Sequence, residues 1–251
     1  MAELWRGEVN RNSLAAPMAR DRNTLIFDLD GTLIDSAPDL HRSLNAVLTE
    51  QGRAAVPLAA IRAMVGDGAA RLVERGFADT GAPVEPAALP GLVQRFLVHY
   101  AAGQHALTQL VPGVIETLAA LHEQGCRLGV CTNKPHGPTL EILELFGLTR
   151  FFGAVTGGDS LPVRKPDPGH LLGTLELLGA AAEDAVMIGD SANDVAVARA
   201  AGVPAIIVRY GYTRTPVEEL GADAIIDRFD EIIPWLGSAD LSEKKAPGPS
   251  S

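Results

Sequence analysis

The sequence predicts an α/β fold in which a doubly wound, Rossmann-like parallel sheet carries an inserted all-helical domain. Two observations support this prediction. From about residue 111 to residue 209, short apolar segments alternate with amphipathic helical segments, which is typical of a parallel sheet covered by helices on both faces. Before this alternation, and after a first apolar run, about seventy residues show only helical periodicity.

The first strand is expected at residues 24–28, "TLIFD", a short apolar run that ends in an acid. A block of helices follows it. The first of these helices begins with Pro38 and closes with Gly52, residue types that favour the first turn and the end of a helix. The four helical segments are 38–52, 57–65, 69–78 and 86–102.

The rest of the chain alternates between helix and strand. The expected helices are 112–125, 137–147, 169–179 and 193–202, and the expected strands are 127–132, 152–157, 185–190 and 204–209. The first strand belongs to the same sheet by the same pattern, so the helical block is an insertion after strand one. We therefore assign 24–35 and 109–237 to the α/β core, 36–108 to a helical cap, and 1–23 and 238–251 to disordered extensions.

Composition and charge limit the classes of partner. The chain has 251 residues, 47% of them hydrophobic, and a formal net charge of −10 at pH 7. Proteins that bind nucleic acid normally carry a basic face, so this charge argues against that class. No apolar stretch reaches the roughly 18 to 20 residues that cross a bilayer, and the N-terminal residues lack the apolar core of a secretory signal. We expect a cytoplasmic monomer or homodimer without nucleic-acid or membrane partners.

Lysine is scarce in this chain. Of four lysines, Lys244 and Lys245 lie in the polar C-terminal segment, which leaves Lys134 and Lys165 for the folded part. Either the protein needs these two lysines or its composition is biased toward arginine. Lys134 follows a predicted strand, and its side chain either reaches the rim of a pocket or faces water.

Acidic residues follow the predicted strands. Asp28 and Asp30 come after the first strand, Asp190 ends a later one, and Asp194 begins the next helix. Ligands of doubly wound sheets bind at the carboxyl ends of the strands, so these acids should converge there. Converging carboxylates repel one another unless a cation lies among them, and oxygen ligands suit Mg²⁺. Asp28, Asp30 and Asp190 are the candidate metal ligands, with the option that one binds through its backbone carbonyl, while Asp194 either holds metal-bound water or orients Lys165.

The spacing of the first two acids predicts a division of catalytic labour. Side chains two residues apart on an extended strand point to the same side, about 6 to 7 Å apart. Gly31 then allows the chain to turn and its backbone amides to face a ligand. One carboxylate can attack while its neighbour transfers protons. Phosphoryl transfer fits best, because Mg²⁺, Lys165 and the Thr132 hydroxyl would neutralise the charge of a phosphoryl group.

Four segments carry this chemistry, "FDLDGTLIDS" (27–36), "VCTNKP" (130–135), "RKPDP" (164–168) and "MIGDSANDVAVARAAG" (187–202). In this order they resemble the four motifs of the haloacid dehalogenase superfamily of aspartyl-phosphate phosphatases. The resemblance extends over residues 24–236, and the helical insertion resembles the C1 cap of that superfamily.

The resemblance implies a role for each matching residue. It implies that Asp28 is the nucleophile, that Asp30 is the acid/base, and that Asp190 binds Mg²⁺ together with Asp28 and the backbone carbonyl of Asp30. It also implies that Thr132 and Lys165 bind the phosphate and that Asp194 supports the site. We add Asn133 as a phosphate ligand, because it follows Thr132 at a strand end, and Ser191 as a second supporting residue.

Two branches of the superfamily do not match this chain. The dehalogenases lack an acid two residues after the nucleophile, whereas Asp30 is present, and the phosphonate-cleaving enzymes use a cap lysine, which residues 36–108 lack. The segments "TNKP", "GGDS", "KPDP" and "YGY", together with the cap segment "VGDGAARLVERG", are most similar to phosphoglycolate phosphatases. Within that cap segment, Gly68 would let the loop approach the site, and Arg71 would either pair with a substrate carboxylate or remain a solvated helix residue.

The leading hypothesis is a Mg²⁺-dependent phosphatase of a small metabolite, with 2-phosphoglycolate as its first candidate substrate. A sugar-phosphate or amino-sugar-phosphate phosphatase, a pyrophosphatase and a phosphoglucomutase-like enzyme remain open within the same superfamily. A phosphate-binding regulatory protein is the alternative outside the enzyme class. A phosphorylated receiver domain is a further alternative, although receivers lack a helical insertion after strand one.

Overall fold

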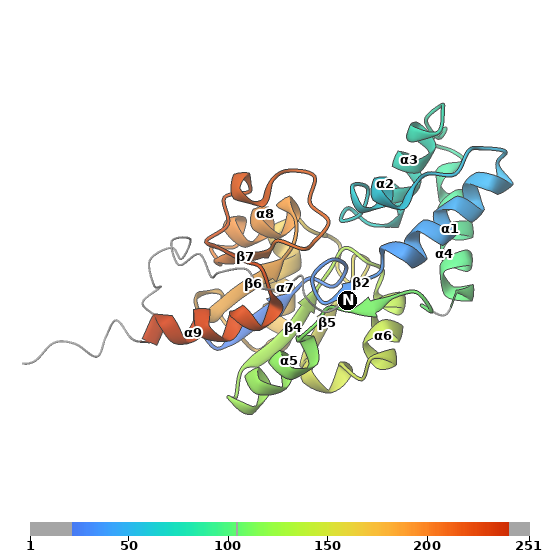
Figure 1. The fold of residues 1–251 in the computed structure, drawn as a ribbon. Helices are drawn as coiled ribbons and strands as arrows, with labels where there is room; N and C mark the ends of the chain where they lie inside the picture. Colours follow the sequence, from blue (N-terminus) through green and yellow to red (C-terminus); the bar gives the residue numbers. More distant parts are fainter. Residues whose placement is uncertain (1–21, 104, 241–251) are drawn as a thin grey trace, which may run out of the picture.

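The computed structural model describes residues 22–103 and 105–240, with side chains up to residue 237. It confirms the predicted fold class, because the main sheet is parallel and has six strands in the order β5-β4-β1-β6-β7-β8 (Figure 1). The strands are β1 (Thr24–Phe27), β4 (Arg127–Cys131), β5 (Ala154–Thr156), β6 (Ala185–Gly189), β7 (Ala205–Val208) and β8 (Ala224–Ile226).

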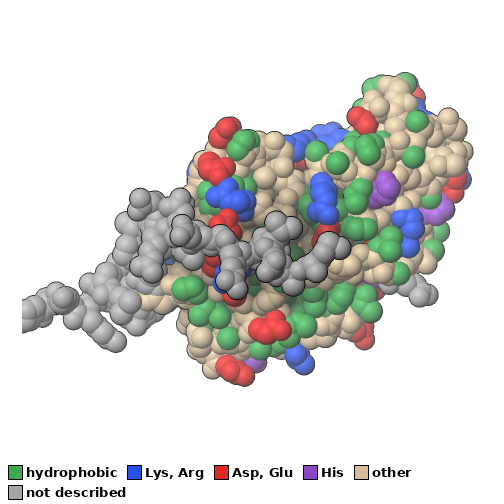
Figure 2. All heavy atoms as spheres, in the orientation of Figure 1, with side chains coloured by type: hydrophobic (Ala, Val, Ile, Leu, Met, Phe, Trp, Pro, Cys, Tyr) green, Lys and Arg blue, Asp and Glu red, His purple; other side chains and the backbone are tan. Residues whose placement is uncertain are grey.

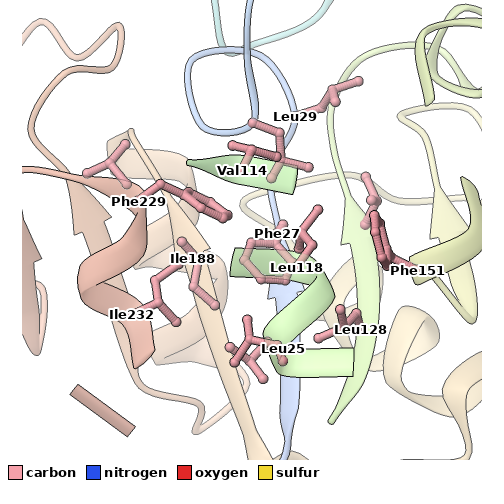
Figure 3. Close-up of a cluster of buried hydrophobic side chains, with 14 of the residues drawn as sticks. Leu25, Phe27, Leu29, Val114, Leu118, Leu128, Phe151, Ile188, Phe229 and Ile232 are labelled. Carbon is pink, nitrogen blue, oxygen red and sulfur yellow. The ribbon is translucent and has the colours of Figure 1, made fainter. Parts of the chain in front are cut away.

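Alternate side chains of β1 belong to two cores on opposite faces of the sheet. Leu25 and Phe27 pack against a cluster that includes residues of α5 (Val114–Glu123), α6 (His136–Leu145) and α9 (Ile232–Asp240). Figure 3 shows Phe27 of this cluster close to Leu118 of α5. Ile26 faces the other way, toward residues of α7 (Pro168–Leu178) and α8 (Ala192–Ala200). Burial on both faces explains why β1 is apolar throughout instead of alternating with polar residues.

The helical insertion has a hydrophobic core of its own. Its helices are α1 (Ala37–Glu50), α2 (Leu58–Arg62), α3 (Ala69–Asp79) and α4 (Leu89–Ala102). Leu44 of α1, Phe77 of α3 and Phe96 of α4 are buried in one cluster, separate from the two clusters of the main sheet. In Figure 1 these four helices stand beside the α/β body. The insertion is therefore stabilised by its own apolar core, and it lies over the strand ends of the sheet.

Two short strands form the passage between the core and the insertion. Strand β2 (Ile34–Asp35) leaves the core and β3 (Gln109–Leu110) returns to it, and the two pair antiparallel with Ile34 opposite Leu110. Neither strand was predicted from the sequence, because two residues are too few to show a periodicity. Strand β8 and helix α9, which complete the sheet and its cover, were not predicted either.

The expected extensions fall mainly outside the described residues. Residues 1–21 and 241–251 are not described, but Arg22 already donates hydrogen bonds to the carbonyls of Glu183 and Ala185, and α9 continues to Asp240. Among the described residues, no helix is long and apolar enough to span a membrane. Figure 2 shows charged and hydrophobic side chains interspersed on the face that it presents.

Candidate active site

The order of the strands brings distant polar residues together. Strand β1 lies between β4 and β6, with Phe27 in register with Val130 and Ile188. Asp28, which follows β1, therefore lies between Thr132, which follows β4, and Asp190, which follows β6. All three side chains are buried. The convergence predicted from the strand ends is thus present in the structure.

The two acids after β1 lie just before a turn. The strand ends at Phe27, and the carbonyl of Leu29 then accepts hydrogen bonds from the amides of Thr32, Leu33 and Ile34. Gly31 has a φ of +86°, and a Cβ there would lie 2.2 Å from an Asp190 carboxylate oxygen. The expectation that Asp28 and Asp30 share one continuous extended strand is therefore wrong beyond Phe27. Glycine is required at position 31 both by the turn and by the close approach of Asp190.

Lys165 links two of the acids. Its Nζ lies 2.9 Å from Asp28 Oδ1 and donates a 2.7 Å hydrogen bond to Asp194 Oδ1. Burial acts to lower the pKa of Lys165, but the carboxylates of Asp194 and Asp28 outweigh it and hold that pKa above its ordinary value. The lysine is therefore charged at neutral pH, and its charge lies between the two carboxylates.

Lys165 does not fully compensate the negative charges of Asp28 and Asp190. Burial, opposed by Lys165 and reinforced by Asp194, raises the pKa of Asp28 to about 6. Burial, with the charges of Asp194 and Asp28, raises the pKa of Asp190 well above its ordinary value. One carboxylate oxygen each of Asp28, Asp190 and Asp194 lie within 4.8 Å of one another. This buried, all-oxygen group can bind a metal ion, whose charge would remove the repulsion that these pKa values report.

Asp194 is already well satisfied by the protein. Besides Lys165, it accepts hydrogen bonds from the backbone amides of Asp190 and Ser191 and from the Ser191 hydroxyl. Ser191 and Asp194 form the capping box of α8, in which each side chain bonds the other's backbone. Both residues thus lie where the sequence placed them, holding the loop that carries Asp190.

The segment after β7 holds Asp190 from the other side. The backbone amide of Tyr212 donates a 2.6 Å hydrogen bond to Asp190 Oδ2. A Cβ at Gly211 would lie 2.1 Å from the Asp190 Cβ, so only glycine allows this approach. The sequence analysis noted "YGY" without assigning it a role, and the structure shows that it positions Asp190.

Asp30 lies outside the acid group and has a lysine of its own. Lys134 Nζ lies 3.1 and 3.2 Å from the two Asp30 carboxylate oxygens and 2.8 Å from the Tyr100 hydroxyl, to which it donates. Ser36 also donates to Asp30. Lys134 is only 6% exposed, so the alternative that it faces water is wrong. Tyr100 was not predicted, because its position depends on how α4 packs over the core.

Thr132 and Asn133 differ in what they offer a ligand. The Thr132 hydroxyl is close enough to Asp28 to lower the pKa of that carboxyl. The Asn133 side-chain amide donates to the carbonyls of Gly66 and Lys165, both at 3.0 Å, so its two N–H groups are already used. Its backbone amide has no hydrogen-bond partner among the described residues, and neither do those of Leu29 and Asp30. These three amides, and not the Asn133 side chain, are the available donors at the strand ends.

The two cap residues predicted to select the substrate are separated in the structure. A cavity of about 40 Å³ lies between the insertion and the strand ends, and Gly68 lines it together with Asp28 and Asp30. Arg71 instead borders a separate open hollow of about 560 Å³. Its side chain is 59% exposed and pairs with Glu74. The structure therefore brings Gly68 to the acids and leaves Arg71 outside the inner cavity.

Buried acids and a buried lysine at the strand ends, beneath a helical insertion, suit phosphoryl transfer. The chain belongs to the haloacid dehalogenase-like hydrolase family, whose model matches residues 25–208. It is a phosphatase of that family, so the receiver-domain alternative is wrong.

Relatives and solved structures agree with this assignment. The chain is 47% identical to a phosphoglycolate phosphatase of Rhodospirillum rubrum over 85% of this chain and 90% of that protein. It is 46% identical to a phosphoglycolate phosphatase of Caulobacter vibrioides over 83% and 88% of the two chains. A crystal structure described as a predicted phosphoglycolate phosphatase from Haemophilus somnus superimposes with a TM-score of 0.81 at 31% identity, covering 86% of this chain and 98% of that one.

Proposed function

We propose that the protein hydrolyses 2-phosphoglycolate to glycolate and phosphate with the help of Mg²⁺. The observation that carries the proposal is the separate lysine partner of each acid after β1. Lys165 contacts Asp28 at the metal-binding acid group, and Lys134 contacts Asp30 at the inner cavity. The names of the relatives support the choice of substrate. Because a multiply charged ester does not cross a bilayer unaided, we further propose that the reaction takes place in the cytoplasm.

In the proposed first step, a carboxylate oxygen of Asp28 attacks phosphorus and the bond from phosphorus to the ester oxygen breaks. Asp30 gives its proton to the leaving oxygen, which departs as the hydroxyl of glycolate. In the second step Asp30 removes a proton from water, and the water oxygen displaces phosphate from Asp28. Both acids return to their starting states. Proton transfer by Asp30 is supported by its place at the cavity, away from the acid group.

The phosphoryl group would be held by groups that surround Asp28. Lys165 and the Thr132 hydroxyl are proposed to bind its oxygens, since both already contact the Asp28 carboxylate. The free backbone amides of Leu29, Asp30 and Asn133 would add donors. For Asn133 the proposal thus changes from the side chain to the backbone.

Mg²⁺ would be held by the side chains of Asp28 and Asp190 and the backbone carbonyl of Asp30. When bound it would neutralise charge on the phosphoryl oxygens, the main electrostatic requirement of phosphoryl transfer. Asp194 and Ser191 would keep the Asp190 loop and Lys165 in place. The raised pKa values of Asp28 and Asp190 support this site, because a cation is what both carboxylates lack.

The test is a panel of phosphate-release assays on 2-phosphoglycolate, hexose phosphates, amino-sugar phosphates and pyrophosphate, each with Mg²⁺ and with chelator. We expect Mg²⁺-dependent release, fastest from 2-phosphoglycolate, and a loss of more than about 10³-fold in Asp28→Asn, because the nucleophile is gone. Asp79→Asn, which removes an acid from the end of α3, is the matched control and should retain full activity.

Four results would contradict the proposal. Full activity of Asp28→Asn would overturn the mechanism, and faster release from a hexose phosphate or pyrophosphate would overturn the substrate. Conversion of a glucose phosphate to its isomer without release would identify a mutase. Binding of phosphate esters without any turnover would identify a regulatory protein.

A further inference from the structure

The inner cavity is small, and its wall is mostly apolar with few charged residues. Of its lining residues, all within the described part of the chain, Lys134 is the single cation, and Asp28 and Asp30 are the acids. Most of the rest of the wall is apolar, from Leu40, Val65, Ala69, Leu72, Phe96, Leu97, Pro135 and Pro138. Its volume of about 40 Å³ is a few times the roughly 10 to 15 Å³ that one water requires. The space suits a leaving group of a few heavy atoms.

The Lys134 ammonium is fixed at one place in this cavity. It donates to both oxygens of Asp30 and to the Tyr100 hydroxyl, and it lies 4.6 Å from the centre of the Tyr100 ring. Tyr100 is itself 2% exposed and packs against Phe96 and His105. A buried lysine held by a carboxylate, a hydroxyl and an aromatic ring loses little further conformational freedom when an anion binds.

The Tyr100 hydroxyl adds a second donor. It accepts its hydrogen bond from Lys134, and its own proton has no acceptor among the described residues. Burial raises the pKa of Tyr100, so this proton stays in place at neutral pH. Asp30 and Tyr100 use the three N–H groups of Lys134, so the cavity offers a carboxylate the positive charge of the ammonium and, beside it, the free O–H of Tyr100.

We propose that Lys134 and Tyr100 form the subsite for a carboxylate on the leaving group, and so select 2-hydroxy-acid phosphates over neutral esters. The inference rests on the proposed function, because it needs Asp30 at the ester oxygen. In 2-phosphoglycolate a single methylene separates the carboxylate from that oxygen. A group that touches Asp30 is therefore within reach of the carboxylate as well, and Lys134 is such a group.

The apolar wall disfavours the competing substrates. The hydroxyl groups of a hexose would meet Leu40, Leu72 and Phe96 and would lose their hydrogen bonds to water without replacement. A carboxylate on a two-carbon unit instead meets Lys134 and Tyr100 directly. Arg71, for which the sequence left open a carboxylate pair or a solvated position, borders the outer hollow and pairs with Glu74.

The experiment compares 2-phosphoglycolate with 2-hydroxyethyl phosphate, in which a neutral hydroxymethyl group replaces the carboxylate. The measured quantity is the ratio of kcat/KM for the two esters in the wild type, Lys134→Met, Tyr100→Phe, Arg71→Met and Arg95→Met. Arg95 is the matched control for loss of a positive charge, since it lies on α4 with Tyr100 but pairs with Glu50 at the surface. Thermal melts establish that each variant is folded.

We expect the wild type to prefer 2-phosphoglycolate and Lys134→Met to lose roughly 30-fold or more of that preference, because the positive charge beside the substrate carboxylate is lost. Tyr100→Phe should lose a smaller part, about 3- to 10-fold, and Arg95→Met should keep the wild-type ratio. Equal loss on both esters in Lys134→Met would mean that it only positions Asp30, and would overturn the inference. Loss of the preference in Arg71→Met but not in Lys134→Met would also overturn it.

A binding measurement separates this inference from the proposed function. Calorimetry with glycolate needs no turnover, and Asp28→Asn provides an inactive background for it. We expect glycolate to bind Asp28→Asn and to bind the double variant with Lys134→Met roughly 10-fold or more weakly. If the wild type released no phosphate from any ester, the proposed function would fail while the glycolate result still decided the subsite. Glycolate binding that is unchanged by Lys134→Met would refute the subsite even in an active phosphatase.

Discussion

Asn193 donates a 2.6 Å hydrogen bond from its side-chain amide to Asp67 Oδ1. The contact joins α8 of the α/β core to the loop that precedes α3 of the insertion. The same amide also donates to the Gly66 carbonyl, and Arg75 and Arg214 lie on the other Asp67 oxygen. Although partial burial acts to raise the pKa of Asp67, the hydrogen bonds from Asn193 and Arg75 outweigh it and lower that pKa. The loop with Gly66 and Gly68 is thus tied down over the cavity.

Replacing Asn193 should weaken this closure. In Asn193→Ala the Asp67 carboxylate loses a donor and the loop is released, so we expect KM for the phosphate ester to rise about 3- to 30-fold. The value of kcat should change less, because the hydrogen bonds of the Asn193 side chain go to the cap loop and not to the acids at the strand ends. Steady-state kinetics provide the measurement. A fall in kcat at constant KM would contradict a role in closure.

Gly211 predicts a steric effect on metal binding. In Gly211→Ala the new Cβ would lie 2.1 Å from the Asp190 Cβ, which must then move. We expect activity to fall by roughly 10²-fold and half-saturation to require more Mg²⁺. Loss of the groups that hold a metal ligand in place commonly lowers metal affinity or activity by about 10- to 100-fold. Magnesium titrations of the activity measure both. Gly91→Ala is the control, because a Cβ there meets nothing within 4 Å.

His170 predicts a dependence of stability on pH. Its Nδ1 accepts a hydrogen bond from the Lys165 amide, and burial together with the Lys165 charge lowers its pKa to about 4. The unfolded chain binds this proton at about pH 6.5, so the contribution of neutral His170 to stability is complete above that pH. It is lost progressively as the pH falls from 6.5 toward 4.

Urea unfolding at pH 7.5 and pH 5 measures the effect in wild type and in His170→Asn. The free energy of unfolding should fall more between these pH values in the wild type, because the variant has no imidazole to protonate. An equal fall in both proteins would show that His170 does not titrate as expected. The comparison between the two proteins removes the contribution of the carboxylates, which are the same in each.

Leu118 and Leu177 offer a matched pair for the core. Leu118 is fully buried within the cluster of Figure 3, whereas Leu177 is 63% exposed. Leu118→Ala should lower the free energy of unfolding by about 2 to 5 kcal/mol, because a cavity remains beneath the sheet. Leu177→Ala should change it by less than about 0.5 kcal/mol. Chemical denaturation of both variants tests the difference.

The sequence predicted the sheet wherever helix and strand alternate, but not where that alternation stops. Between β7 and β8 the chain forms only a short 3₁₀ turn at Val217–Glu219. The sequence therefore has no helical pattern there that would indicate a further strand. Strand β8 has three residues, as β5 does, but it lacks the preceding helix that marks β5 in the sequence. Another 3₁₀ turn, Phe229–Glu231, joins β8 to helix α9. Because β8 was not predicted, the start of α9 was not predicted either.

The site was predictable where a residue follows a strand and unpredictable where it depends on packing. Asp28 and Asp190 come directly after β1 and β6, so their convergence follows from the parallel sheet alone. Lys134 also follows a strand, but its burial depends on Tyr100, which reaches it only after α4 has packed on the core. Helical periodicity likewise does not tell which side of α3 faces the cavity, and so the role of Arg71 stayed open between a carboxylate pair and a solvated position.

Strands β2 and β3 carry the chain out of the α/β core and back into it as one pair. Ile34 and Leu110 are partners across this pair, so about 5 Å separates the two ends of a segment more than seventy residues long. Another fold with neighbouring ends could replace that segment while the strands of the sheet, and Asp28 and Asp190 at their ends, stay in place. The helical insertion between β2 and β3 can therefore be exchanged as one unit during evolution, while the residues at the strand ends are retained.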